Sequence, residues 1–194
     1  MKYAILAAGL ALAFPVSVAQ AEPARYELDP EHVAIAFLVD HIGYAKTLGK
    51  FLEVEGSFLF DETVPSVSEL EVAIAADSVF TAHERRDDHV RSNDFLAAED
   101  HPEITFVMTG AEPSGPRTGQ VLGDLTIRGV TRPVSLDVTW NKSGTYPFNN
   151  NYVTGISART TIKRSDFGMT YAVENGLVGD EVEIVIEAEA IRQD

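Results

Sequence analysis

The chain has no cysteine, and it is poor in basic side chains and in long apolar segments. Without cysteine it can form no disulfide, thiolate nucleophile or cysteine-ligated metal site, so a folded domain must depend on core packing. Basic residues number 15 against 30 acidic ones, which gives a formal net charge of −15. A surface of this sign repels phosphate backbones and anionic lipid headgroups, so nucleic-acid binding and electrostatic attachment to membranes are not expected.

One apolar run stands at the N-terminus, where Lys2 precedes the apolar segment 4–13 and an Ala-x-Ala site that ends at Ala21. This layout is typical of a cleaved secretory signal peptide, and the run is too short for a membrane span. We therefore predict a signal peptide over 1–21, a single domain over 22–194, and a periplasmic or secreted location. The residue after the site is not cysteine, so no lipoprotein anchor is expected, and no later run is long enough for stable membrane insertion.

Apolar and polar side chains alternate through most of the remaining sequence. A period of two predicts strands with one buried and one solvated face, as in antiparallel sheets, and no helical stretch long enough for a crossover separates them. Eight antiparallel strands can stack as a sandwich or close as a barrel, and closure removes the exposed edges. We predict an all-β, eight-stranded antiparallel, lipocalin-like β-barrel. Its strands include residues 33–39, 52–60, 70–74, 104–109, 121–128, 134–140, 152–163 and 181–189.

Residues 81–98 break the alternation and are dense in charge. Thr81 and Glu84 have the spacing of a capping box, in which each side chain bonds a free backbone N–H at a helix start. This pattern predicts a short helix across one end of the barrel.

The inward face of the strands is apolar, and it forms either a dry core or the lining of a lipid site. A barrel of eight strands is just wide enough to fill its own interior or to hold one small ligand, so both interpretations stay open on the pattern alone. The residues that we predict to point inward are Ile35, Phe37, Val39, Phe58, Phe60, Val72, Ile74, Phe106 and Ile127.

Motifs for catalysis are missing from the sequence. It has no Gly-x-Ser-x-Gly elbow and no Gly-rich phosphate loop. His83 and His89 are six residues apart and do not converge on a helix, whereas His83 and Asp87 can converge but make only a two-ligand site. We predict a protein that is not an enzyme, with no catalytic residues, no metal site and no cofactor. A metal-dependent enzyme or stress protein on the same barrel is the alternative, and a structural or adhesive domain is a third hypothesis.

The few basic side chains gather in three places, and two interpretations of these clusters remain open. They can be salt-bridge partners for neighbouring aspartates, or one cluster can neutralise a polar ligand head at the mouth of the barrel. The candidates for head binding are Arg86, His89, Arg91, Arg128 and Arg164.

Several motifs, taken in order, resemble the YceI-like family of periplasmic, polyisoprenoid-binding, lipocalin-like proteins. They include Tyr26-Glu-Leu-Asp29 with His32, the segment Arg86–Phe95, and Arg164-Ser-Asp-Phe-Gly168. The most specific piece is Gly123–Thr131. The sequence departs from the family pattern at Val90, where leucine is usual, at Leu96, where phenylalanine is frequent, and at His101, where tyrosine is common.

The resemblance implies a barrel that holds a long isoprenoid, quinone-like or other aliphatic lipid, with no established catalytic residues. It adds Phe95 and Phe167 to the expected lining, with Phe167 as a plug at one end. It also suggests that Arg164 pairs with Asp166, and that Gly123 and Gly129 take unusual backbone angles. The expected partner is the lipid alone, and a homodimer is open. The sequence does not specify the lipid, its headgroup, or its donor and acceptor.

Overall fold

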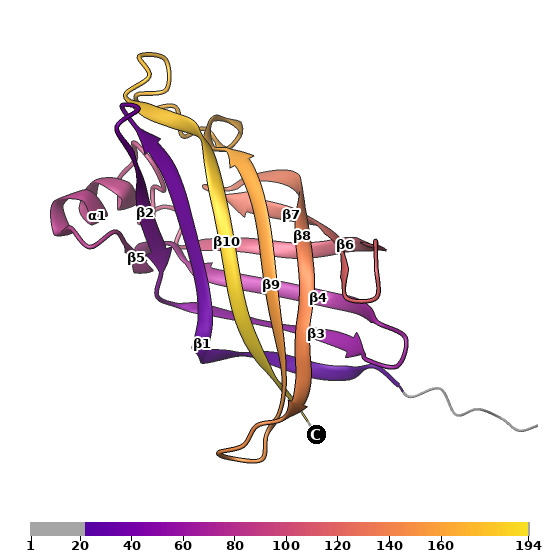
Figure 1. The fold of residues 1–194 in the computed structure, drawn as a ribbon. Coiled ribbons are helices and arrows are strands. Elements are labelled where there is room, and N and C mark those ends of the chain that lie inside the picture. Colours follow the sequence, from indigo (N-terminus) through magenta and orange to yellow (C-terminus); the bar gives the residue numbers. More distant parts are fainter. Residues whose placement is uncertain (1–21, 194) are drawn as a thin grey trace, which may run out of the picture.

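Strands dominate the chain in the computed structural model, which describes residues 22–193 (Figure 1). The predicted signal peptide, residues 1–21, lies outside the described residues. The strands are β1 (Ala24–His41), β2 (Ala45–Phe51), β3 (Val54–Asp61), β4 (Ser66–Ala75), β5 (Val79–Phe80), β6 (Glu103–Pro113), β7 (Thr118–Ile127), β8 (Val130–Thr145), β9 (Tyr152–Lys163) and β10 (Val178–Arg192). The helices are α1 (Glu84–Arg91) and two 3-10 helices, η1 (Ala76–Ser78) and η2 (Arg164–Phe167).

The sheet closes on itself because the first and last strands pair. β1 runs antiparallel to β10 from Tyr26, opposite Arg192, to His41, opposite Val178. The remaining strands follow in the order β10-β9-β8-β7-β6-β4-β3-β1. β2 pairs with the C-terminal half of β1 and β3 with its N-terminal end, so together they form one interrupted side of the wall. The predicted eight-stranded antiparallel barrel is confirmed.

One strand, β2, was not predicted from the sequence pattern because two of its three inward positions are not apolar. These two are Thr47 and Gly49, opposite Val39 and Phe37 of β1, and only Phe51, opposite Ile35, is apolar. A Cβ atom on Gly49 would lie 2.2 Å from Cζ of Phe37, so the ring needs the space that glycine leaves. Leu52, which the alternation placed on the inward face, follows β2 at a bend and is 57% exposed, so that assignment was wrong.

Gly123 and Gly129 have different roles. Gly129 has a φ of +70° in the turn between β7 and β8, as expected for a glycine position. Gly123 lies within β7, and no unusual backbone angle explains it, contrary to expectation. A Cβ atom there would meet Cζ of Phe106 at 2.3 Å. The Phe106 ring therefore covers Gly123 in the way that the Phe37 ring covers Gly49.

The predicted helix exists as α1, beside β2 and β5 at one end of the barrel (Figure 1). The predicted capping box was wrong, because His83 precedes the helix and no side chain caps it. Thr81 instead donates its backbone N–H and its hydroxyl to Oδ1 of the buried Asp87, at 2.7 and 2.5 Å. Burial alone would raise the pKa of Asp87, but these hydrogen bonds outweigh it and lower the pKa. Within residues 22–193, no helix has the length and apolarity to cross a membrane.

Candidate ligand-binding cavity

The barrel encloses an apolar cavity of about 300 Å³. Ten of the eleven side chains that we expected in its lining are there: Ile35, Phe37, Val39, Phe58, Phe60, Val72, Ile74, Phe95, Phe106 and Ile127. The eleventh, Phe167, is 2% exposed and belongs to the core cluster, but it does not line the cavity. That these residues bind a ligand remains a prediction.

Much of the remaining lining comes from strands whose alternation was visible but whose residues we did not single out. They include Leu136, Val138 and Trp140 on β8, Ile156 and Ile162 on β9, and Ile184 and Ile186 on β10. Apart from Thr154, Thr160 and Arg164, every lining residue has an apolar side chain. The Thr154 hydroxyl already shares a hydrogen bond with Oγ of Ser143 at 2.8 Å. Such a wall suits an aliphatic chain and offers almost nothing to a charged group.

At one end of the barrel, which we call the Glu62 end, a carboxylate joins two tyrosines. Tyr26 and Tyr152 donate their hydroxyls to the two oxygens of Glu62, at 2.8 and 3.0 Å. Tyr26 is 1% exposed and stacks on Phe58 with a centroid separation of 5.5 Å. Burial, and then the bond to Glu62, raises the pKa of Tyr26. Packed side chains therefore fill this end, and no sequence pattern marked Glu62, because the pairing joins residues distant in the chain.

The other end, the α1 end, is covered by the residues that follow α1 and by the segment between β9 and β10 (Figure 1). Phe95, which lines the cavity, lies 5.1 Å from the ring of His89 and 5.5 Å from that of Tyr171, between centroids. His89 and Tyr171 are themselves 5.0 Å apart. The Arg164 guanidinium lies over the Phe95 ring at 5.5 Å. An aromatic path thus connects the cavity wall with the outer surface.

Arg164 is a buried brace rather than a free cation. It is 2% exposed and donates to the carbonyl oxygens of Gly179, Met169, Tyr171 and Val178, at 2.7–2.9 Å. The expected pairing with Asp166 is absent among the described salt bridges, because the guanidinium donates to these carbonyls instead. Arg164 thereby holds the β9–β10 segment against the barrel.

Arg86 and Arg91 attach α1 to the residues before it. Arg86 donates to the hydroxyl and the carbonyl oxygen of Thr81 at 2.7 and 2.6 Å. Arg91 donates to the carbonyl oxygens of Asp77 and Val79 at 2.7 and 3.0 Å. Neither side chain lines the cavity.

Arg128 and His89 hold the residues after α1. Arg128 donates to the carbonyl oxygens of Asn93 and Phe95 at 3.0 and 2.7 Å, and His89 contacts the Asp94 carboxylate at 2.8 Å. All five candidates for head binding therefore lie at or near the α1 end and already have protein partners. Their headgroup role remains untested, and the geometry gives each of them a bracing role.

Among residues 22–193, the structure assembles a group of metal-ligand type that sequence reasoning missed. The pairing of β1 with β10 shifts between Leu28 and Val33, and this bulge brings Asp29 and His32 beside Glu189. Ligand atoms of the three residues all lie within 4.8 Å of one another, and Nδ1 of His32 is 2.8 Å from Oδ2 of Asp29. Nitrogen and carboxylate donors of this kind can hold a divalent metal. We had predicted no metal site, since the shift in register is not visible in the sequence.

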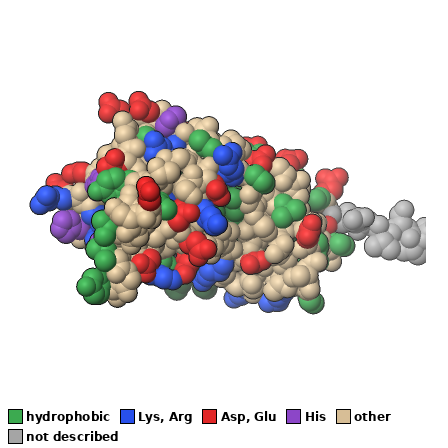
Figure 2. All heavy atoms as spheres, turned by 90° about the horizontal axis from the view of Figure 1, so that it is seen from above, with side chains coloured by type: hydrophobic (Ala, Val, Ile, Leu, Met, Phe, Trp, Pro, Cys, Tyr) green, Lys and Arg blue, Asp and Glu red, His purple; other side chains and the backbone are tan. Residues whose placement is uncertain are grey.

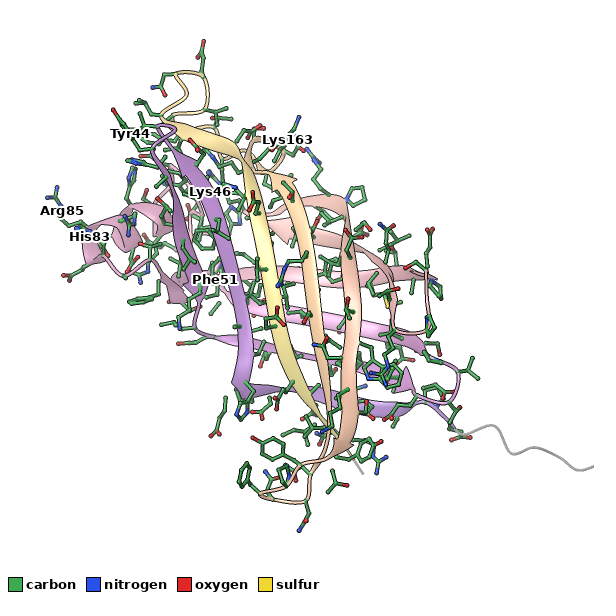
Figure 3. All side chains as sticks on the ribbon, in the orientation of Figure 1. Tyr44, Lys46, Phe51, His83, Arg85 and Lys163 are labelled. Atoms are coloured by element: carbon green, nitrogen blue, oxygen red, sulfur yellow. The ribbon has the colours of Figure 1, made fainter. Side chains whose placement is uncertain are left out.

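The outer surface carries acidic side chains with basic ones between them (Figure 2). His83, just before α1, and Arg85 in its first turn project away from the barrel wall, and both are exposed (Figure 3). Asp87, whose spacing from His83 would allow a two-ligand metal site, is buried with its carboxylate bound to Thr81, whereas His83 is exposed.

Comparison with known proteins agrees with this architecture. A UPF0312 protein of Pectobacterium carotovorum subsp. carotovorum is 38% identical over 185 residues, which cover 94% of each chain. The structure of Burkholderia cenocepacia BcnA has a TM-score of 0.75 at 23% identity and covers 84% of this chain and 98% of that one. A polyisoprenoid-binding domain from Saccharophagus degradans has a TM-score of 0.61 at 13% identity, with coverage of 88% and 99%. At these identities the two structures show a shared fold.

The family assignment rests on a match over nearly the whole domain. The model of the YceI-like domain matches residues 26–190, which run from the start of β1 almost to the end of β10. The chain belongs to the YceI-like family.

Proposed function

We propose that this protein is a periplasmic carrier that holds the chain of an isoprenoid, quinone-like or other long aliphatic lipid in its barrel. The observation that carries the proposal is the closed cavity wall, which is apolar apart from two threonines and the braced Arg164. The polyisoprenoid-binding name of a structural relative supports the ligand class. The protein acts by binding and needs no cofactor besides the lipid.

The energetics of burial favour a long chain over a short one. Each buried CH2 contributes roughly 0.8 kcal/mol, so ten buried carbons contribute about 8 kcal/mol before the cost of association is subtracted. A short prenyl alcohol cannot offset that cost, whereas a long polyprenyl tail can do so without polar recognition. Binding therefore depends on chain length more than on the headgroup.

Thermal unfolding of delipidated protein tests the proposal. A ligand that binds only the folded state stabilises it by about 2.7 kcal/mol at a hundredfold excess over Kd, which corresponds to a rise in Tm of roughly 5–11 °C for a domain of this size. We expect this shift with a long prenyl lipid and little shift with a short prenyl alcohol. An unchanged Tm across quinone, prenyl and fatty-amide ligands, on protein shown to be lipid-free, would falsify the carrier function.

A glycine substitution tests whether the lipid lies in this cavity. Gly123→Ala must push the Phe106 ring away from the wall and into the cavity, because the new Cβ would lie 2.3 Å from it. We expect weaker binding of long prenyl lipids with a modest loss of stability. Gly110→Ala is the matched control, since nothing lies within 4 Å of a Cβ atom at that position. Equal affinity in the two variants would place the lipid elsewhere.

The predicted signal peptide supports the periplasmic location. Mass spectrometry of exported protein should find a mature chain that begins at Glu22. The metal-dependent alternative now has its own group in Asp29, His32 and Glu189. It predicts stoichiometric metal that is lost in His32→Ala, measured on protein purified without added metal.

A further inference from the structure

Four large apolar side chains are exposed together at the α1 end of the barrel. We call them the apolar rim: Ile42 (45% exposed) and Tyr44 (88%) in the β1–β2 turn, and Tyr171 (46%) and Leu177 (45%) between β9 and β10. The two segments are joined, because the Ile42 N–H donates to the carbonyl oxygen of Leu177 at 3.1 Å. Tyr44 lies at the tip of its turn, pointing away from the barrel (Figure 3). The rim is therefore one surface built from two distant parts of the chain.

Ile42 is an unsuitable residue for the conformation in which it is held. It has a φ of +57° and Gly43 has a φ of +70°, with the Tyr44 N–H bonded to the His41 carbonyl oxygen at 3.1 Å. Asparagine, aspartate or glycine is favoured at a turn position with positive φ, and a β-branched side chain is strained there. The strain brings no large gain in core packing, because the Ile42 side chain is 45% exposed. Because the strained backbone of Ile42 is not compensated by packing in the fold, we infer that its exposed side chain has a function.

The apolar rim is continuous with the cavity wall. Tyr171 contacts Phe95, which lines the cavity, at a centroid separation of 5.5 Å. Val178, next to Leu177, and Met169, two residues before Tyr171, also line it. A lipid chain that moves between the cavity and the outside along this path stays in contact with apolar side chains.

We propose that the apolar rim docks transiently on the surface of a lipid bilayer and that lipid passes between the bilayer and the cavity at this end. The proposal rests on the proposed carrier function and adds the surface with which the carrier meets its source. Aromatic and aliphatic side chains insert at the interface of a membrane. The formal net charge of −15 opposes anionic headgroups, so the bilayer that fits this protein is one without net charge.

The far end of the molecule supplies a matched control. Phe148, between β8 and β9, is 86% exposed, about as much as Tyr44. It does not line the cavity, and its neighbour Tyr146 contacts it at 5.6 Å between centroids. Removing Phe148 deletes a similar apolar area without touching the rim.

The experiment compares the full-length mature protein with Ile42→Asn/Tyr44→Ser and with Phe148→Ser. Partition onto phosphatidylcholine vesicles is measured by flotation, and transfer of decaprenol between vesicles is measured over time. The rim variant should lose at least about tenfold in partition and slow transfer in proportion, since one buried aliphatic side chain accounts for about that factor. Phe148→Ser should match wild type. Ile42→Asn alone should melt no lower than wild type, because asparagine suits the turn.

The docking proposal would be overturned if the rim variant partitioned onto vesicles as well as wild type, or if Phe148→Ser lost as much partition as the rim variant. The rim would then fit a protein partner instead. Decaprenol supplied from detergent separates this failure from failure of the carrier function. All three proteins should bind it equally, because neither change touches the cavity lining. If wild type does not bind decaprenol from detergent, the carrier function fails, and flotation on lipid vesicles without decaprenol still decides whether the rim docks.

Discussion

The two ends of the barrel are held by different kinds of contact. At the Glu62 end, side chains bond to side chains around the buried Tyr26 ring. At the α1 end, arginines donate to backbone carbonyls of loop segments, as Arg164 does to Met169 and Tyr171 and Arg128 does to Phe95. A plug of packed side chains depends on each of its members, so removing one of them lowers the free energy of unfolding strongly. Carbonyl braces hold a segment in place, and we expect each to be released while the barrel wall stays intact, which would suit the end at which we propose that lipid enters.

The largest effect is expected at the Glu62 end. Tyr26→Ala removes a buried ring that stacks on Phe58 and leaves Glu62 with Tyr152 alone. We expect a loss of about 3–5 kcal/mol, as for other large aromatic truncations, and a fall in Tm of roughly 6–20 °C. Chemical denaturation measures the loss of free energy of unfolding. Tyr26→Phe keeps the ring and should lose much less of that free energy. If both variants lost the same amount, the hydroxyl rather than the ring would hold this end.

Arg164→Met should have a smaller and more local effect. It leaves four carbonyl oxygens without their donor, at a cost of about 2–4 kcal/mol. Hydrogen exchange should accelerate in residues 169–179 while the strand ends around Tyr26 keep their protection. Exposed Lys163 provides the control Lys163→Met, which should change neither region. Uniform acceleration at both ends would contradict the division between them.

Arg128→Ala separates bracing from headgroup recognition. As a brace, Arg128 contributes about 1–2 kcal/mol through Asn93 and Phe95, so its loss should weaken binding of a prenyl alcohol and a prenyl pyrophosphate alike. As a headgroup ligand, it would affect the pyrophosphate alone. Titration of both lipids against wild type and variant distinguishes these roles. Arg86→Ala should leave the fold intact and should affect neither lipid if Arg86 only anchors Thr81.

The smallest effect is a response of the two ends to opposite extremes of pH. The lowered pKa of Asp87 gives stability that is present above the unfolded value and is lost as pH falls through the folded one, so residues 81–98 should loosen below about pH 4. The raised pKa of Tyr26 gives stability that is present below the unfolded value and is lost as pH rises beyond about pH 10. Hydrogen exchange across pH measures both. Simultaneous loosening of the two ends at one extreme would contradict this picture.

The strands of the barrel wall were predictable from the sequence, but the contacts that close its two ends were not. Alternation identifies a strand face wherever inward positions are apolar, as at Ile35 and Phe106, but it fails in β2, where Gly49 accepts a ring from another strand. Charge alone marked the arginines without showing that their partners would be backbone carbonyls. Glu62 and the group around His32 depend on contacts between distant segments. Around His32, the register shift between β1 and β10 decides which side chains meet.

The pairing of β1 with β10 also governs how the molecule comes to be folded. The two strands that complete the ring lie at opposite ends of the domain, so their pairing closes a loop that contains all the other strands. Such non-local pairing slows folding, and until it forms, both β1 and β10 present open edges to which another chain can add. Synthesis releases β10 last, so the ring cannot close on a partly made chain. The ring of a protein with this order of strands can therefore close only when its synthesis is nearly complete, and before that point the pairing that would oppose threading through a narrow channel is missing.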